Sequence, residues 1–154
     1  MFDAIKDFFT KVSEGGSEIS FDDNDHRLAT AALLTHAMRA DGIIRDSEHA
    51  AIKNSLKKQY DLSDNELEEL MREGEQADSD AIDFYTFTSA LKREFDREDR
   101  GKIVEMLWSV VLADGYIHEL EDNFVWRVAE LLGIETRERV MLRQKVEAKL
   151  AANN

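Results

Sequence analysis

The stretch that decides the fold covers residues 40–48 and reads ADGIIRDSE. A near copy, ADGYIHELE, covers residues 113–121. Both follow the pattern A-D-G-x-I-x-(D/E)-x-E, and Asp114 of the second copy lies 73 positions after Asp41 of the first. A repeat that spans nearly half of a chain governs its architecture. The repeat predicts an internal duplication of a helix–turn–helix unit, packed with pseudo-twofold symmetry.

Helices are expected on both sides of each turn, because apolar residues there recur at spacings of three and four. The glycine of each turn tolerates the left-handed backbone that ends a helix. Asp23 or Asn24 is the expected cap of the first helix. Residues 78–80 predict a polar turn, and residues 96–99 predict a short link. Helices are predicted over about 24–39, 46–60, 63–76, 83–95, 100–113, 119–132 and 136–152. No stretch alternates as a strand does, so the fold class is all-α with about seven helices.

A separate segment precedes this domain. Residues 1–16 predict an N-terminal amphipathic helix followed by a glycine-rich joint, and residues 21–152 predict the main helical domain. The polar face of the first helix has balanced charge, whereas helices that lie on membranes are usually rich in Lys and Arg. Docking on the domain or on a partner protein is therefore the favoured role of this helix.

Composition excludes several classes of protein. The chain has 154 residues, a net charge of -13 and no cysteine. Such a charge argues against nucleic-acid binding, which needs clustered Lys and Arg to neutralise phosphates. The absence of cysteine removes disulfides and thiolate metal sites. No stretch has the apolar length of a transmembrane helix, and the start does not resemble a secretory signal. A cytoplasmic protein is expected.

The repeated turns supply carboxylates at matching positions. Asp41 and Glu48 in the first turn correspond to Asp114 and Glu121 in the second. Hard cations such as Ca²⁺ and Mg²⁺ prefer oxygen ligands, but a single turn has too few oxygens for a Ca²⁺ loop of the EF-hand type. The two turns brought together would pool four carboxylates. These four residues are the predicted metal ligands, for Ca²⁺, Mg²⁺ or Mn²⁺.

A purely structural interpretation of the same residues is also open. Each glutamate would be the third residue of its helix, where a carboxylate can accept from backbone N–H groups. Each aspartate could accept from the turn backbone, and Ile44 is expected in the core. The cap positions hold Arg45 and His118, which are poor capping residues. His118 could ligate a transition metal, but its counterpart Arg45 cannot, so a symmetric histidine site is excluded.

No catalytic pattern is present in the sequence. There is no Glu-x-x-His pair, no H-E-x-x-H motif, no glycine-rich phosphate loop and no G-x-S-x-G elbow. A non-enzymatic protein is expected. Its alternative role is that of a protein-interaction scaffold, in which the turns are helix caps and the N-terminal helix or the acidic surface recruits a partner.

The two A-D-G-x-I-x-x-x-E turns within a duplicated helical domain resemble the tellurite-resistance TerB family, over about residues 27–146. The resemblance implies an all-helical, cytoplasmic stress-response domain without enzymatic activity. It also implies metal binding through the acidic turn residues, which are Asp41, Glu48, Asp114 and Glu121 here. Partner proteins, including those of membrane-associated stress complexes, are expected on the same basis. The family pattern has small capping residues where this chain has Arg45 and His118.

Overall fold

The computed structural model describes residues 25–115 and 117–152. This part of the chain is all-α, as predicted, and contains seven helices and no strand. The helices are α2 (His26–Arg39), α3 (Asp46–Tyr60), α4 (Asp64–Asp80), α5 (Tyr85–Glu94), α6 (Arg97–Val111), α7 (Glu119–Leu131) and α8 (Thr136–Ala152). The predicted amphipathic helix over residues 1–16 lies outside the described residues. None of the described helices has the length and apolar character needed to cross a membrane.

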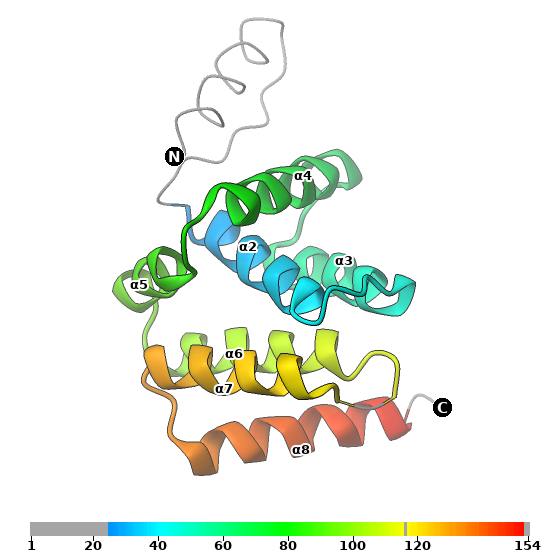
Figure 1. Ribbon diagram of the computed structural model, residues 1–154, viewed down its shortest axis with the longest axis vertical. Helices are drawn as coiled ribbons and strands as arrows, with labels where there is room; N and C mark the ends of the chain where they lie inside the picture. The colour runs from blue at the N-terminus through cyan, green and yellow to red at the C-terminus, as the bar shows by residue number, and fades with distance from the viewer. Residues whose placement is uncertain (1–24, 116, 153–154) are drawn as a thin grey trace, which may run out of the picture.

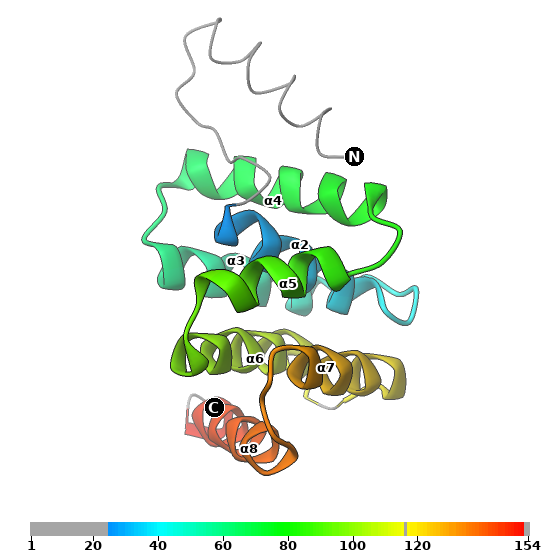
Figure 2. The same ribbon diagram turned by 90° about the vertical axis from the view of Figure 1, so that its left-hand side faces the viewer.

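The helices form layers, which Figure 2 shows from the side. Helix α4 lies at one end, α2 with α3 and α5 comes next, α6 with α7 follows, and α8 covers the other end. Helix α2 contacts α3, α4, α5, α6 and α7, and its residues from Leu28 to Thr35 are all buried. One continuous hydrophobic core runs through the layers. The α2–α3 turn and the α6–α7 turn lie on the same side of the molecule (Figure 1).

Three predicted boundaries were wrong, each because of a contact that involves an aspartate. Helix α2 is capped by Asp25, whose side chain accepts from the backbone N–H of Arg27, and not by Asp23 or Asn24. Helix α4 continues through the expected polar turn to Asp80, and Asp78 there pairs with His36 of α2. Helix α6 begins at Arg97, because Asp96 caps it. The predicted capping box of Ser63 and Glu66 is confirmed.

Helices α2 and α4 approach each other most closely at Gly74. A Cβ atom on Gly74 would lie 2.7 Å from the Cβ of Ala31 and 3.0 Å from its carbonyl carbon. Such separations are far below van der Waals contact, so the glycine sets the distance between the two helices. Helix α8 is held differently, because polar contacts tie it to α6. Lys149 pairs with Glu105 at 2.8 Å, and the indole N–H of Trp108 donates to the backbone carbonyl of Arg139.

Helix α4 also carries a buried acid, Glu73. Its side chain is almost fully buried, and neither carboxyl oxygen has a hydrogen-bond partner among the residues that the structure describes. Burial, with a further contribution from the charge of Glu69, raises the pKa of Glu73 to about 9. The folded protein therefore keeps this acid neutral at pH values at which the unfolded chain ionises it.

We expect the substitution Glu73→Gln to stabilise the protein at pH 8 and to have little effect near pH 4.5. The folded state binds a proton that the unfolded state releases above pH 4.5, so stability falls as the pH rises from there to about 9. Glutamine does not titrate and avoids this loss, which is at most about 1.4 kcal/mol per pH unit. Urea unfolding of both proteins between pH 4.5 and pH 9 measures the difference. Parallel pH profiles would contradict the prediction.

Candidate metal centre

The two repeated turns meet in space, although they lie half the chain apart. In each turn the glycine adopts the left-handed backbone, with φ of +78° at Gly42 and +100° at Gly115. This conformation ends the preceding helix and returns the chain into α3 or α7. The Nε of Arg45, from the first turn, lies 3.3 Å from Oδ2 of Asp114, from the second. The turns therefore form one joint cluster.

Arg45 lies at the middle of this cluster. Its guanidinium donates to Asp41 Oδ2 at 2.9 Å and to Glu48 Oε1 at 3.1 Å, in addition to the contact with Asp114. These hydrogen bonds raise the pKa of Arg45, and the one to Asp41 holds the pKa of that carboxyl below its usual value. One fixed positive charge thus serves carboxylates from both turns.

The two glutamates lie beneath this layer and are completely buried. Glu48 uses Oε1 to accept from Arg45, and no other N–H or hydroxyl group of the described residues donates to its carboxyl group. No N–H or hydroxyl group in the part of the chain that the structure covers donates to Glu121, whose carboxyl group instead lies in hydrogen-bonding contact with that of Glu48. Burial, together with the neighbouring Glu48 carboxyl, raises the pKa of Glu121. The cluster therefore contains a buried carboxyl group that has no positive charge of its own and favours the neutral form.

Helix capping does not account for the glutamates. Among the described residues, no backbone N–H donates to Glu121, and the contacts of the Glu48 carboxyl group are with the side chains of Arg45 and Glu121. The aspartate of the first turn does cap its backbone, since Asp41 Oδ1 accepts from the N–H of Ile43 at 3.1 Å. The expectation that Ile44 enters the core was wrong, because this side chain is 59% exposed. The structural interpretation thus explains Asp41 in part and leaves Glu48 and Glu121 unexplained.

His118 completes the cluster from the start of α7. Its Nε2 lies 2.9 Å from Asp114 Oδ2. An ionised carboxylate can only accept, so Nε2 is the donor. The other ring nitrogen, Nδ1, faces Asp41 at 4.0 Å from Oδ2. Potential ligand atoms of Asp41, His118 and Glu121 all lie within 4.8 Å of one another, which is close enough for a shared ion.

The sequence predicted the correct turns, but it did not predict the role of each residue in them. Asp41, Glu48, Asp114 and Glu121 gather in one place, and Asp41 and Glu121 belong to the group that could hold an ion. Glu48 and Asp114 instead contact Arg45, and Asp114 also contacts His118. The sequence could not show that Arg45 reaches across to the other turn, because this contact depends on how α3 packs against α6.

Comparison with known proteins gives one result. The sequence model of a family described as tellurite resistance protein TerB matches residues 27–144. This range includes both turns and most of the described helices. No curated protein and no solved structure matches the chain significantly.

Proposed function

Because the chain belongs to the tellurite resistance TerB family, we propose that it is a non-enzymatic domain that binds a divalent cation between its two ADG turns. The family match covers the whole of the joint cluster, and its description places the domain with tellurite resistance. The cation site is a further step, which the chemistry of the cluster supports. Stress-response partners stay an expectation that follows from the family.

The observation that carries the proposal is the environment of Glu121. Its side chain is fully buried, and among the described residues no N–H or hydroxyl group reaches its oxygens. The groups beside it are two further acids, Glu48, whose carboxyl is in hydrogen-bonding contact with it, and Asp41. Leaving a buried polar group unsatisfied costs about 1–3 kcal/mol, and more for a charged group. A cation between Glu121 and Asp41 would take the place of the proton on Glu121 and bind these oxygens.

The residues present fit such an ion. Asp41, Glu121 and His118 would hold it, while Asp114 orients the imidazole. Arg45 pairs with Glu48 and Asp114 and also with Oδ2 of Asp41. Ligand atoms on opposite sides of an ion lie about 4.2 Å apart for Mg²⁺ and about 4.8 Å apart for Ca²⁺. The potential ligand atoms of the three residues all lie within 4.8 Å of one another, which does not exceed the larger of these two spans. The bound ion would supply positive charge and join the two turns.

The alternative function, a protein-interaction scaffold, makes a different use of the same domain. The segment proposed to recruit a partner, residues 1–16, lies outside the described residues. That alternative also treats the turn glutamates as helix caps. Among the described residues, however, no backbone N–H group donates to Glu121, which argues against this role. Cation binding therefore explains more of the cluster than capping does.

We expect the full-length protein, freed of metal, to bind one divalent cation per chain. Ion binding to the folded state should raise the melting temperature, by an amount that corresponds to about 2.7 kcal/mol at a free concentration of 100 Kd. Calorimetry and thermal unfolding with Ca²⁺, Mg²⁺, Mn²⁺ and Zn²⁺ measure both effects. The double variant Asp41→Asn/Glu121→Gln should lose the response and still fold, because it neutralises an acid that is buried.

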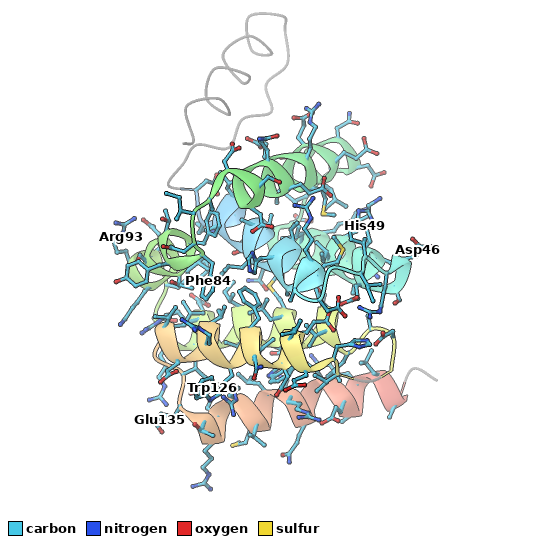
Figure 3. All side chains as sticks on the ribbon, in the orientation of Figure 1. Asp46, His49, Phe84, Arg93, Trp126 and Glu135 are labelled. Atoms are coloured by element: carbon cyan, nitrogen blue, oxygen red, sulfur yellow. The ribbon has the colours of Figure 1, made fainter. Side chains whose placement is uncertain are left out.

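The matched control is Asp46→Asn. Asp46 is an exposed carboxylate at the start of α3 (Figure 3), close to the turn but outside the ligand group. This variant should bind cations as the natural sequence does. If no ion produces heat or a thermal shift, or if the double variant responds as strongly as the control, the proposed function is wrong.

A further inference from the structure

We propose that the ion held by the two turns is a divalent transition ion of the Zn²⁺ and Co²⁺ kind, not Ca²⁺ or Mg²⁺, and that Nδ1 of His118 is one of its ligands. This inference rests on the proposed function. It adds the class of ion and a nitrogen ligand that is not among the four repeated carboxylates.

The orientation of His118 is the first argument. The hydrogen bond from Nε2 to Asp114 Oδ2, 2.9 Å long, orients the ring and places a hydrogen on Nε2. In a neutral imidazole with its hydrogen on Nε2, Nδ1 carries the lone pair. Nδ1 is the atom that faces Asp41, with 4.0 Å between it and Oδ2. Histidines that ligate metals usually donate their other ring N–H to a carboxylate or carbonyl in this way.

The second argument is the number of oxygen atoms that are available to coordinate an ion. Ca²⁺ takes six to eight oxygen ligands, from a protein and from water. Here the guanidinium of Arg45 already uses oxygens of Asp41, Glu48 and Asp114. Among the described residues, the group within reach of one ion consists of the carboxylates of Asp41 and Glu121 and the imidazole of His118. Three ligands that include a histidine, completed by water, are typical of zinc, and imidazole suits Zn²⁺ better than Mg²⁺ or Ca²⁺.

The difference between the two turns is the third argument. Arg45 stands in the first turn where His118 stands in the second, and each precedes the first residue of its helix. The first turn therefore contributes a fixed cation, and the second contributes a nitrogen donor. Only one ion with a nitrogen ligand can form per chain from this pair.

Calorimetric titration of the full-length, metal-free protein with Zn²⁺, Co²⁺, Ca²⁺ and Mg²⁺ tests the inference. We expect one Zn²⁺ per chain, bound at least 100-fold (order of magnitude) more tightly than Ca²⁺. In His118→Gln, Zn²⁺ affinity should fall by roughly 10- to 100-fold, with little change for Ca²⁺. His49→Gln, which changes a histidine of α3 outside the ligand group (Figure 3), is the matched control and should retain Zn²⁺ affinity.

Long-range proton–nitrogen NMR of the natural sequence gives a second reading that needs no variant. Zn²⁺ should shift the Nδ1 resonance of His118 and leave the side-chain resonances of His26, His36 and His49 in place. Binding of Ca²⁺ or Mg²⁺ in preference to Zn²⁺, or a Zn²⁺ affinity that His118→Gln does not change, would overturn this inference and leave the proposed function standing. No binding of any of the four ions would overturn both.

Discussion

Replacement of Arg45 by methionine is expected to tighten divalent-cation binding by roughly tenfold or more, since a bound cation would no longer be repelled by the guanidinium. Arg45 contacts Asp41, Glu48 and Asp114 at 2.9, 3.1 and 3.3 Å. It is therefore the positive charge that balances the cluster when no ion is bound. Methionine has a similar length and an apolar stem, so the substitution removes the charge with little change in volume.

The same variant should be less stable than the natural sequence when metal is absent, because four carboxylates then face one another without a guanidinium. Added metal should restore its melting temperature, and the increase should be larger than for the natural sequence. Calorimetry and thermal unfolding, each with and without Zn²⁺, measure these effects. The control is Arg39→Met, which removes a partly exposed arginine that pairs with Asp78, away from the cluster. Weaker cation binding by the Arg45 variant would mean that the guanidinium holds the ligands in place.

The substitution Gly74→Ala should destabilise the fold by about 1–3 kcal/mol, the usual cost of overpacking a core. Its new methyl group would lie 2.7 Å from the Cβ of Ala31 and 3.0 Å from the Ala31 carbonyl carbon. The second of these atoms is backbone of α2, which is packed against five other helices, so α2 and α4 would have to separate. This cost exceeds the gain of about 1 kcal/mol that alanine brings to a helix interior relative to glycine.

A matched control for this prediction is Gly101→Ala in α6. There the added Cβ would lie 3.7 Å from a Glu138 oxygen and 3.9 Å from Leu142 Cδ1, which are ordinary contacts. Gly101→Ala should therefore stabilise the protein, by up to about 1 kcal/mol. Adding Ala31→Gly to Gly74→Ala should recover part of the lost stability. Urea unfolding followed by circular dichroism gives all three values, and a stabilising Gly74→Ala would show that α2 and α4 can move apart freely.

The helices could be predicted from the sequence because their signals are local. Ser63 and Glu66 form the expected capping box, and the glycines of both turns end their helices. The prediction failed at Asp78, where a polar stretch remains helical because this aspartate pairs with His36 of α2. That contact joins residues far apart in the sequence, and no local pattern contains it. The proposed internal duplication stays a prediction.

For the candidate site as well, the sequence predicted the local features but not the contacts between distant residues. The repeat located all four carboxylates, since both turns carry the same motif. It gave no indication that Glu121 is fully buried or that Arg45 reaches the other turn. Both facts depend on how residues that are far apart in the sequence pack together. The sequence did contain one signal of this kind. The two copies of the repeat differ at one position, which is Arg45 in the first copy and His118 in the second.

The meeting of the two turns has a consequence for the topology of the chain. An ion shared by Asp41 and Glu121 would close a loop that contains half of the protein, including α3, α4, α5 and α6. A cross-link between distant residues removes conformational entropy from the unfolded chain, and the effect grows with the size of the loop. In a chain without cysteine, such an ion would act as a reversible cross-link. The concentration of free metal would then set the stability of the domain against heat and mechanical force.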